Sequence, residues 1–208
     1  MSYAVKEIFL TLQGEGMQAG RRAVFLRFAG CNLWSGREQD RADADCGFCD
    51  TDFVGTDGEN GGRYEAQALA ARVEALWGDR ERRLVVVTGG EPMLQLDAAL
   101  IDALHARGFE VAVESNGTLP APPGIDWLCV SPKAGTRVVQ RCGDELKLVW
   151  PQAGIDPGEL AGWDFRHLLI QPMDGPDRDV ALAASIGLVM ANPRWQLSLQ
   201  THKLIGLP

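Results

Sequence analysis

The sequence has little of what marks exported, membrane-bound or nucleic-acid-binding proteins. No uninterrupted apolar run approaches the roughly 20 residues of a membrane-spanning helix, and the first residues lack the basic region and apolar core of a signal peptide. Basic residues are outnumbered, with 20 lysines and arginines against 28 aspartates and glutamates and a formal net charge of -8. These shortages predict a cytoplasmic protein without a membrane or a nucleic-acid partner.

Cysteine is also scarce, with five in 208 residues. Thiols stay reduced in the cytoplasm, so these cysteines are expected to be metal ligands or buried thiols rather than a disulfide framework. Internal repeats and low-complexity linkers are absent, and 46% hydrophobic with 23% charged residues is ordinary for a globular domain. The length predicts a single domain over residues 1–208.

Apolar segments that alternate between strand and helix character predict an α/β fold. Strands are expected at residues 23–28, 84–87, 109–113, 127–130, 145–149, 167–170 and 195–199, and helices at 64–77, 95–107 and 177–186. This alternation favours parallel strands with right-handed crossovers, but a complete eight-fold barrel takes about 250 residues. We therefore expect an incomplete, open (β/α) barrel with about six mostly parallel strands and few helices.

Three cysteines, Cys31, Cys46 and Cys49, have the spacing Cys-x14-Cys-x2-Cys at the start of a polar, glycine-rich segment. That segment, residues 32–62, is expected to be a long functional loop. A [4Fe–4S] cluster normally takes four thiolates, so three would leave one iron open to a small molecule. Cys129 in an apolar strand and the distant Cys142 are not obvious fourth ligands. A structural zinc site or three unrelated loop thiols remain alternatives.

A second motif, Thr88-Gly89-Gly90-Glu91-Pro92, ends the strand at 84–87. The two glycines let the backbone approach a ligand closely, and a carboxylate beside them can hold an ammonium group. Such a turn is a weak signal alone but a strong one after a three-cysteine loop. Together the two motifs resemble the radical S-adenosylmethionine (SAM) superfamily. The resemblance implies that the open iron chelates SAM and that Gly89, Gly90 and Glu91 support its methionine part.

Further motifs resemble one family of that superfamily, the 7-carboxy-7-deazaguanine synthases, in order along nearly the whole chain. They are Leu12-Gln13-Gly14-Glu15-Gly16, Arg27 before Cys31, Cys49-Asp50-Thr51, Glu114-Ser115-Asn116-Gly117-Thr118, Ser131-Pro132-Lys133, Gln171-Pro172-Met173-Asp174 and Gln200-Thr201-His202-Lys203. Most of the superfamily has Cys-x3-Cys-x2-Cys, whereas here the first gap has fourteen residues, 32–45. Some members of this family carry such an expansion, so it does not indicate lost function, but its path stays open.

The resemblance implies a radical SAM lyase of 7-deazapurine (queuosine) biosynthesis. Its reaction is the ring contraction of 6-carboxy-5,6,7,8-tetrahydropterin to 7-carboxy-7-deazaguanine with loss of ammonia, with SAM regenerated as a cofactor. The implied metals are one [4Fe–4S] cluster on Cys31, Cys46 and Cys49, and Mg²⁺ on Thr51 with remaining oxygens from water and substrate. An electron donor such as a flavodoxin is expected, and a homodimer, because an open barrel leaves apolar edges to cover.

The same resemblance assigns the binding residues. The adenosyl part of SAM would be held by Ser131, Pro132, Lys133, Gln171, Pro172, Met173 and Asp174, which follow strands where barrel proteins bind ligands. Substrate would be bound by Leu12, Gln13, Gly14, Glu15, Arg27, Thr88, Glu114, His202 and Pro208. Arg27 could pair with the substrate carboxylate through two contacts, Gln13 and Glu15 could satisfy ring edges, and the terminal carboxylate of Pro208 could accept hydrogen bonds.

Simpler roles are open for several of these residues. Thr51 could be a turn or cap residue, the two proline motifs ordinary turns, Glu114 and His202 buried structural residues, and the tail after His202 a hydrophobic segment packed on the barrel. Two other functions also stay open: a radical SAM activase that places a glycyl radical on a partner protein, and a non-enzymatic zinc module.

Overall fold

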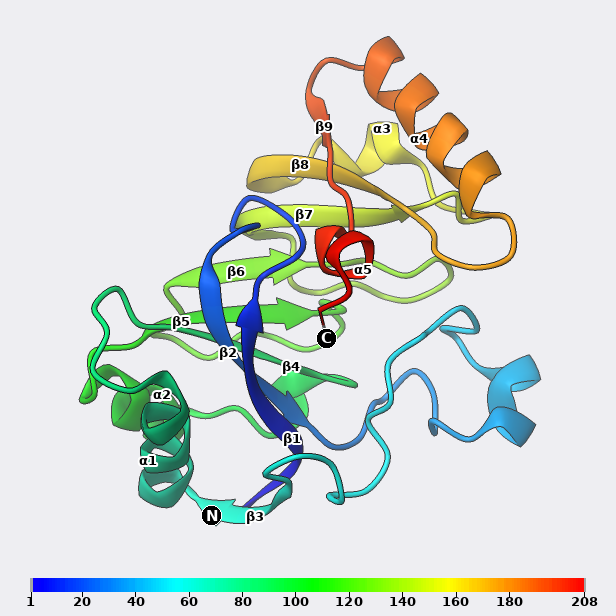
Figure 1. The fold of residues 1–208 in the computed structure, drawn as a ribbon. Coiled ribbons are helices and arrows are strands. Elements are labelled where there is room, and N and C mark those ends of the chain that lie inside the picture. Colours follow the sequence, from blue (N-terminus) through cyan, green and yellow to red (C-terminus); the bar gives the residue numbers. More distant parts are fainter. Residues whose placement is uncertain (1, 208) are drawn as a thin grey trace.

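The computed structural model describes residues 2–207, and its centre is one nine-stranded sheet that curves into an open barrel (Figure 1). The strands are β1 (Ser2–Leu12), β2 (Arg22–Phe28), β3 (Gly62–Glu65), β4 (Leu84–Gly89), β5 (Glu110–Ser115), β6 (Trp127–Val130), β7 (Cys142–Trp150), β8 (Asp164–Pro172) and β9 (Trp195–Leu197). Their order in the sheet is β3-β1-β2-β4-β5-β6-β7-β8-β9. Neighbours from β2 through β9 pair in parallel, whereas β1 is antiparallel to β2 and β3.

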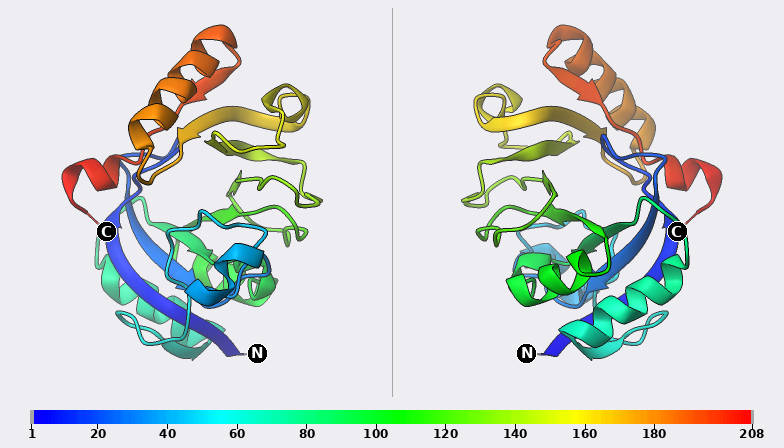
Figure 2. Two further views of the ribbon diagram at one scale, coloured as in Figure 1. Left: turned by 90° about the vertical axis from the view of Figure 1, so that its right-hand side faces the viewer. Right: turned by 90° about the vertical axis from the view of Figure 1, so that its left-hand side faces the viewer.

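Few helices accompany this sheet. They are α1 (Ala66–Trp77), α2 (Ala98–His105), α3 (Pro157–Leu160), α4 (Arg178–Ala191) and α5 (Thr201–Ile205), with 3₁₀ turns η1 (Glu38–Asp43) and η2 (Pro92–Leu94). Helix α1 packs on α2, β1 and β2, and α4 packs on β8 and β9, so both lie on the outer side of the curved sheet (Figure 2). The expected open α/β barrel with few helices is confirmed. None of the helices described for residues 2–207 has the length and hydrophobicity needed to span a bilayer.

Strand register brings the carboxyl ends of the parallel strands to one edge. Phe28 of β2 is opposite Gly89 of β4, and Ser115 of β5 is opposite Val130 of β6. The loops after these strands therefore start side by side, which is where parallel barrels place their ligand sites. The left view of Figure 2 looks onto this edge, and the segment around η1 lies in front of it.

The core explains why the central strands read as continuous apolar runs. In β4, the four residues Leu84–Val87 are all buried, since helices cover one face and the barrel interior the other. Helix α1 adds Leu69, Val73 and Trp77 to the same core. Gly78, with φ of 73°, ends that helix in a conformation that glycine adopts without strain.

Two strands escaped prediction from the sequence. Strand β1 places the charged side chains of Lys6 and Glu7 between apolar ones, which hides its pattern. Lys6 is nonetheless buried, because its ammonium group pairs with Asp52 and Asp57 at 2.8 Å each. Strand β3 takes residues that were assigned to the helix at 64–77, so α1 begins only at Ala66.

The other boundaries also differ from expectation in places with a local cause. Helix α2 begins at Ala98 rather than 95, because the side chain of Asp97 accepts a hydrogen bond from the Leu100 N–H and caps it. Strand β7 begins at Cys142 and strand β8 at Asp164, earlier than their apolar runs, because these two residues already pair with each other. With β1 and β3 included, the sheet has nine strands instead of about six.

The segment 32–62 is more ordered than the loop predicted from its composition. Leu33, Trp34 and Phe53 are buried, and the Trp34 and Phe53 rings meet edge to face at 5.7 Å. After the last cysteine the chain returns along β1, where Ile8 N–H donates to the Glu59 carbonyl at 2.7 Å. The segment thus packs against the barrel and carries apolar anchors of its own.

Candidate active site

A cavity of about 390 Å³ opens at the carboxyl ends of the parallel strands. This volume is within the usual range of ligand pockets. Most of the residues singled out from the sequence line it: Leu12, Gln13, Glu15, Arg27, Cys31, Cys46, Cys49, Thr51, Thr88, Gly89, Gly90, Glu114, Ser131, Lys133, Gln171, Met173, Asp174 and His202. Segments up to 190 residues apart in the sequence therefore converge on one site.

A few predicted site residues lie outside the lining. Gly14, Glu91, Pro132 and Pro172 do not line the cavity. Gly14 is directly behind His202, because a Cβ at that position would meet the imidazole ring at 2.1 Å. Pro208 lies outside the described residues, so the role proposed for its carboxylate stays a prediction.

Three cysteine thiols face the cavity from the cluster loop, residues 31–49. Burial raises the pKa of the Cys31 thiol. Cys46 donates its S–H to Cys49, which raises the pKa of Cys46 and lowers the pKa of Cys49 to about 6. Cys129 is 3% exposed within β6, Cys142 is exposed, and neither lines the cavity. The expected division of the five cysteines into three at the site and two elsewhere matches this placement.

The donor set suits a cluster rather than a single ion. Across residues 2–207, no three histidine, cysteine, aspartate or glutamate side chains have the spacing of ligands around one metal ion. A zinc site needs such ligands at about 2.0–2.3 Å from one centre, whereas each thiolate of a [4Fe–4S] cluster can bind an iron of its own. Three cysteines that line one cavity fit the cluster.

Within the cluster loop, Arg41 joins the fourteen-residue insert, residues 32–45, to the segment that carries Cys46 and Cys49. Its guanidinium donates to the carbonyls of Gly47 at 2.8 Å and Cys49 at 3.1 Å, and it lies over the Trp34 ring at 4.1 Å. Glu38 of the same 3₁₀ turn accepts from Arg41 at 2.8 Å. The insert therefore acts as a scaffold that fixes the backbone between the second and third cysteines.

The Gly-Gly turn packs directly on the first cysteine. Gly89 has φ of 143°, and a Cβ at Gly90 would lie 2.3 Å from the Gly30 carbonyl oxygen and 2.6 Å from the Cys31 Cβ. Glu91 N–H donates to the same Gly30 carbonyl at 3.0 Å. The two motifs recognised in the sequence are thus neighbours, and only a residue without a side chain fits between them.

Glu91 behind this turn is fully buried. Its carboxylate accepts hydrogen bonds from Met93 N–H and Ser115 Oγ–H, both at 2.9 Å, and from Asn116 N–H at 2.7 Å. Burial raises its pKa, and these donors counteract the rise. In this arrangement Glu91 fastens the turn to the loop after β5, and a contact between Glu91 and an ammonium group of SAM stays a prediction.

The loop after β6 borders the cluster loop. Ser131 N–H donates to the Ser115 carbonyl at 2.8 Å, and Lys133 Nζ donates to Ser131 Oγ at 2.7 Å. Lys133 also lies 5.9 Å from the centre of the Phe48 ring, and burial lowers its pKa. Gln152 supports the loop from below by accepting the Ala134 N–H at 3.0 Å.

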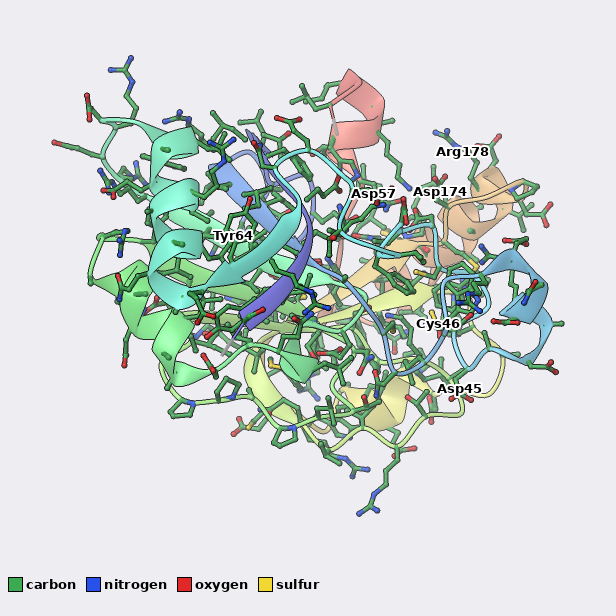
Figure 3. The ribbon with its side chains drawn as sticks, turned by 90° about the horizontal axis from the view of Figure 1, so that it is seen from below. Asp45, Cys46, Asp57, Tyr64, Asp174 and Arg178 are labelled. Carbon is green, nitrogen blue, oxygen red and sulfur yellow. The ribbon has the colours of Figure 1, made fainter. Side chains whose placement is uncertain are left out.

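The C-terminal helix crosses the mouth of the cavity. Lys203 Nζ donates to Asp50, which directly follows the cluster loop, and to Asp174 after β8, both at 2.7 Å. Thr201 N–H donates to the Gly14 carbonyl at 2.9 Å, which places His202 over the β1–β2 loop. Figure 3 labels Cys46 and Asp174 on the same side of the barrel, where these segments meet.

The far half of the cavity holds a polar network, of which the sequence motifs predicted only Gln13, Glu15 and Glu114. Gln13 Nε2 donates to Glu114 Oε1 at 2.8 Å, and Lys147 Nζ pairs with Glu15 at 2.5 Å and Glu114 at 3.0 Å. Lys147 was missed, although the alternation Glu145-Leu146-Lys147-Leu148 in β7 puts every second residue on one face of the strand. Polar residues at every second position of this strand were the signal that could have identified Lys147 as a site residue.

Arg27 pairs with Glu7, a residue that the sequence motifs did not predict at the site. Its Nε donates to Glu7 Oε1 at 2.7 Å, and both side chains line the cavity. The Arg27 side chain is 18% exposed, so one edge of the guanidinium is held while the group stays at the cavity surface. An arginine fixed in this way is suited to a two-point contact with a carboxylate.

Comparison with known proteins places this site in a family. A model described as the radical SAM superfamily matches residues 39–141. The 7-carboxy-7-deazaguanine synthase of Caulobacter vibrioides is 64% identical over 210 residues, and that of Bordetella pertussis is 60% identical over 210 residues, each covering 100% of both chains. The chain belongs to the 7-carboxy-7-deazaguanine synthase family. The crystal structure of QueE from Escherichia coli matches at a TM-score of 0.73 and 26% identity, covering 97% of this chain and 95% of that chain.

Family membership confirms the interpretation drawn from the motifs. The chain is a radical SAM enzyme, and the superfamily implies a [4Fe–4S] cluster and SAM as its cofactors. The two other functions considered for the sequence, a glycyl-radical activase and a zinc module, have no support among these relatives. The family does not by itself assign roles to individual residues of this 7-carboxy-7-deazaguanine synthase homologue.

Proposed function

We propose that this enzyme converts 6-carboxy-5,6,7,8-tetrahydropterin to 7-carboxy-7-deazaguanine with loss of ammonia, and that Mg²⁺ assists. The observation that carries the proposal is the division of one cavity into two halves. One half has three cysteines beside a Gly-Gly turn, and the other has Arg27 and two carboxylates at its floor. A cavity with this division can hold a SAM-binding cluster and a ring with many hydrogen-bond donors side by side.

The cluster half is proposed to bind through Cys31, Cys46 and Cys49. When bound, the cluster and SAM supply the one-electron chemistry that starts the ring contraction. The backbone of Gly89 and Gly90 lines the cavity and can lie against the methionine part of SAM. Ser131, Lys133, Gln171, Met173 and Asp174 line the cavity and would surround the adenosyl part and exclude water from it, with Pro132 and Pro172 fixing the backbone beside them.

The floor half is proposed to bind the pterin. Arg27 would pair with the substrate carboxylate, which is the strongest single contact available because it joins two opposite charges in a partly buried site. Glu15 and Glu114 would accept hydrogen bonds from the N–H groups of the pyrimidine ring, and Gln13 would contact its carbonyl edge. Thr88, Leu12 and His202 would complete the walls, with Gly14 behind His202.

A magnesium ion is proposed at Thr51, which lines the cavity after the last cysteine. One hydroxyl is a weak ligand alone, but Mg²⁺ keeps several waters and takes further oxygens from substrates. The support for this site is that Thr51 lines the same cavity as the three cysteines and Arg27. Thr51→Ala is expected to reduce the stimulation by Mg²⁺ while leaving SAM binding unchanged, and equal stimulation in both proteins would remove Thr51 from the proposal.

An anaerobic turnover assay tests the function. Cluster-loaded protein with reductant, SAM and 6-carboxytetrahydropterin should form 7-carboxy-7-deazaguanine without any partner protein, detected by its absorbance and mass. Arg27→Met, which removes the charge and keeps much of the apolar side chain, should raise the KM by about tenfold or more. Reductive cleavage of SAM without loss of ammonia from the pterin would contradict the proposed substrate.

We further propose a homodimer and reduction by a small electron carrier of the flavodoxin type. The dimer is supported by the two sheet edges, β3 and β9, and by apolar side chains on the outer helices, with Val180 68% and Met190 81% exposed. An exposed apolar surface of this kind is commonly covered by association. Sedimentation velocity at micromolar concentration should give the mass of two chains, and a monomer would contradict the dimer.

A further inference from the structure

Lys147 is the most buried charged group at the floor of the cavity. Its side chain is 4% exposed, and its ammonium group contacts carboxylates from two other parts of the chain, Glu15 after β1 and Glu114 at the end of β5. The third charged residue of the network therefore comes from β7, across the barrel from β1. One cation thus joins three segments of the chain at the cavity.

Both carboxylates have further partners that set their direction. Glu15 Oε1 accepts from Gln200 Nε2 at 2.9 Å, and Glu114 Oε1 accepts from Gln13 Nε2 at 2.8 Å. In each case the second oxygen, Oε2, is the one that meets Lys147. The lysine therefore occupies the point at which the two carboxylates face each other.

Other charged and titratable groups surround this point from neighbouring strands. Glu145 is two residues before Lys147 on β7 and is opposite Cys129 of β6, and both groups, like Lys133 after β6, interact electrostatically with Lys147. The Glu145 carboxylate accepts hydrogen bonds from Met17 N–H at 3.0 Å and Trp127 Nε1–H at 3.3 Å. The Lys133 ammonium group donates a hydrogen bond to Ser131 Oγ. Lys147 is therefore the only one of these groups that places a positive charge between Glu15 and Glu114 in the described structure.

The physical need for such a cation follows from the burial of the pair. Two carboxylates that share a poorly hydrated site cannot both stay ionised near neutral pH without a compensating charge, and one of them takes up a proton. A protonated carboxyl turns one acceptor into a donor. It would then oppose, rather than accept, an N–H of the pyrimidine ring.

We propose that Lys147 is a positioning residue for substrate recognition, which holds the carboxylates of Glu15 and Glu114 in place as hydrogen-bond acceptors at the cavity. The inference rests on the proposed pterin function, since it assigns the two carboxylates to the N–H donors of that ring. It also states the class of ligand that the floor selects. A flat ring with at least two outward N–H donors fits, and a ring with acceptors at those positions is rejected.

The electrostatics of the network agree with the geometry. Burial favours the neutral form of Glu15, but the charge of Lys147 and hydrogen bonds from its neighbours lower the pKa of Glu15 to about 2. Burial likewise opposes the charge of Lys147, and the carboxylates of Glu114 and Glu15 raise its pKa well above the ordinary value. Neither group changes charge near neutral pH while the other is present.

The test is the pH dependence of pterin affinity in the cluster-loaded protein with SAM, measured anaerobically between pH 6.0 and 8.5. Lys147→Met removes the charge and keeps the length of the side chain. Lys147→Arg keeps the charge, and Lys147→Met with Glu114→Gln removes the cation and one carboxylate together. Arg21→Met is the matched control, because it breaks an ion pair of 2.6 Å with Glu110 that does not line the cavity.

The expected result is a new titration in one variant only. Lys147→Met should bind the pterin at least about tenfold more weakly than wild type at pH 6.0, with part of the loss recovered at pH 8.5, whereas SAM affinity is unchanged. Wild type, Arg21→Met, Lys147→Arg and the double variant should all be flat over this range. A flat profile in Lys147→Met, or the same slope in the double variant, would overturn the inference.

Two outcomes separate this inference from the proposed function. Normal pterin binding by the wild type with unchanged affinity in Lys147→Met overturns the inference alone. No pterin binding by the wild type at any pH overturns both. If Lys147→Met does not fold, Lys147→Arg carries the test, because a displaced charge should weaken affinity with a flat profile, and a sloping profile would contradict the proposal.

Discussion

Gly90 shows most clearly how single residues determine this site. The backbone at this position lies so close to Gly30 and Cys31 that no side chain fits, and the obstructing atoms belong largely to the backbone and cannot move aside. The Gly-Gly pair is therefore required by the packing of the cluster loop, in addition to any approach of SAM. This constraint leads to a test that does not depend on turnover.

Gly90→Ala should displace Cys31 and lower the iron content of reconstituted protein to less than about half of the wild-type value, because the new methyl group would lie 2.6 Å from the Cys31 Cβ. Gly187→Ala is the matched control, since no atom lies within 4 Å of a Cβ at that helical position. The control should keep its iron and gain up to about 1 kcal/mol of stability. Full iron loading in Gly90→Ala would contradict the packing argument.

The pKa of Glu15 leads to a prediction about acid stability. Its pKa is about 2 in the folded protein, below the ordinary value of 4.5. A lowered pKa contributes stability that is present above the unfolded-state pKa and is lost as the pH falls towards the folded-state value. In wild type this contribution, on the order of 3 kcal/mol for a shift of this size, should therefore disappear between about pH 4.5 and pH 2.

Urea unfolding between pH 5 and pH 2.5 measures this loss. Glu15→Gln should be less stable than wild type at pH 5, and its free energy of unfolding should fall less steeply over that range. Glu81→Gln, at an exposed surface position, should follow the wild-type curve. Parallel curves for Glu15→Gln and wild type would show that the carboxylate does not titrate as the ion pair with Lys147 requires.

Candidate site residues could be identified from the sequence where a motif had a fixed order. The three cysteines, Arg27 and the Gly-Gly turn were identified in this way, and the structure places all of them at one cavity. Lys147 and Glu7 were missed because each is a single charged residue in a strand, and only the barrel brings them to their partners. Glu91 was assigned to a ligand, but its three hydrogen bonds are to the protein.

At the scale of elements, the insert at residues 32–45 is the feature that most needs an explanation. It folds into η1 and presents Arg41 to two carbonyls of the cluster loop. A positive charge beside the loop that carries Cys46 and Cys49 would favour the reduced, more negative state of a bound cluster. The insert would thus stabilise the loop and tune the potential at once.

Arg41→Gln should shift the reduction potential of the cluster to a more negative value by roughly 20–60 mV, which corresponds to about 0.5–1.4 kcal/mol for one electron. It should also increase the rate of cluster loss in air. Arg37→Gln is the control, because Arg37 is exposed and its hydrogen bonds with Ser35, Trp34 and Asp40 all use its backbone atoms. Equal potentials in wild type and Arg41→Gln, measured by redox titration with electron paramagnetic resonance, would contradict the tuning role.

Element boundaries were predictable where hydrophobic periodicity was undisturbed and unpredictable elsewhere. Strand β6 has the bounds expected from its apolar run, and the strand at 23–28 differs by one residue. Strand β1 was hidden because Lys6 is buried through ion pairs with residues about 50 positions away, which no local pattern reveals. The start of α1 was misplaced because Tyr64 and Glu65, which were assigned to the helix, pair with β1 as part of β3.

At the scale of the whole molecule, the open barrel gathers loops from most of the chain at one edge. Because β2 and β4–β9 run parallel, every loop after these strands starts at the same end, and α5 returns across the mouth. The length of the chain was sufficient to predict an incomplete barrel, since too few residues remain for eight units. The antiparallel pairing of β1 that widens the sheet was not predictable from length.

The central claim is that three cysteines, and only three, hold the cluster, so that one iron is left for SAM. Iron and sulfide per chain, measured after anaerobic reconstitution of five single Cys→Ala variants, test this claim most directly. Wild type, Cys129→Ala and Cys142→Ala should each contain about four irons and four sulfides, because neither cysteine lines the cavity. Variants at Cys31, Cys46 and Cys49 should lose most of both. Loss of the cluster in Cys129→Ala or Cys142→Ala, with the fold retained, would contradict the claim.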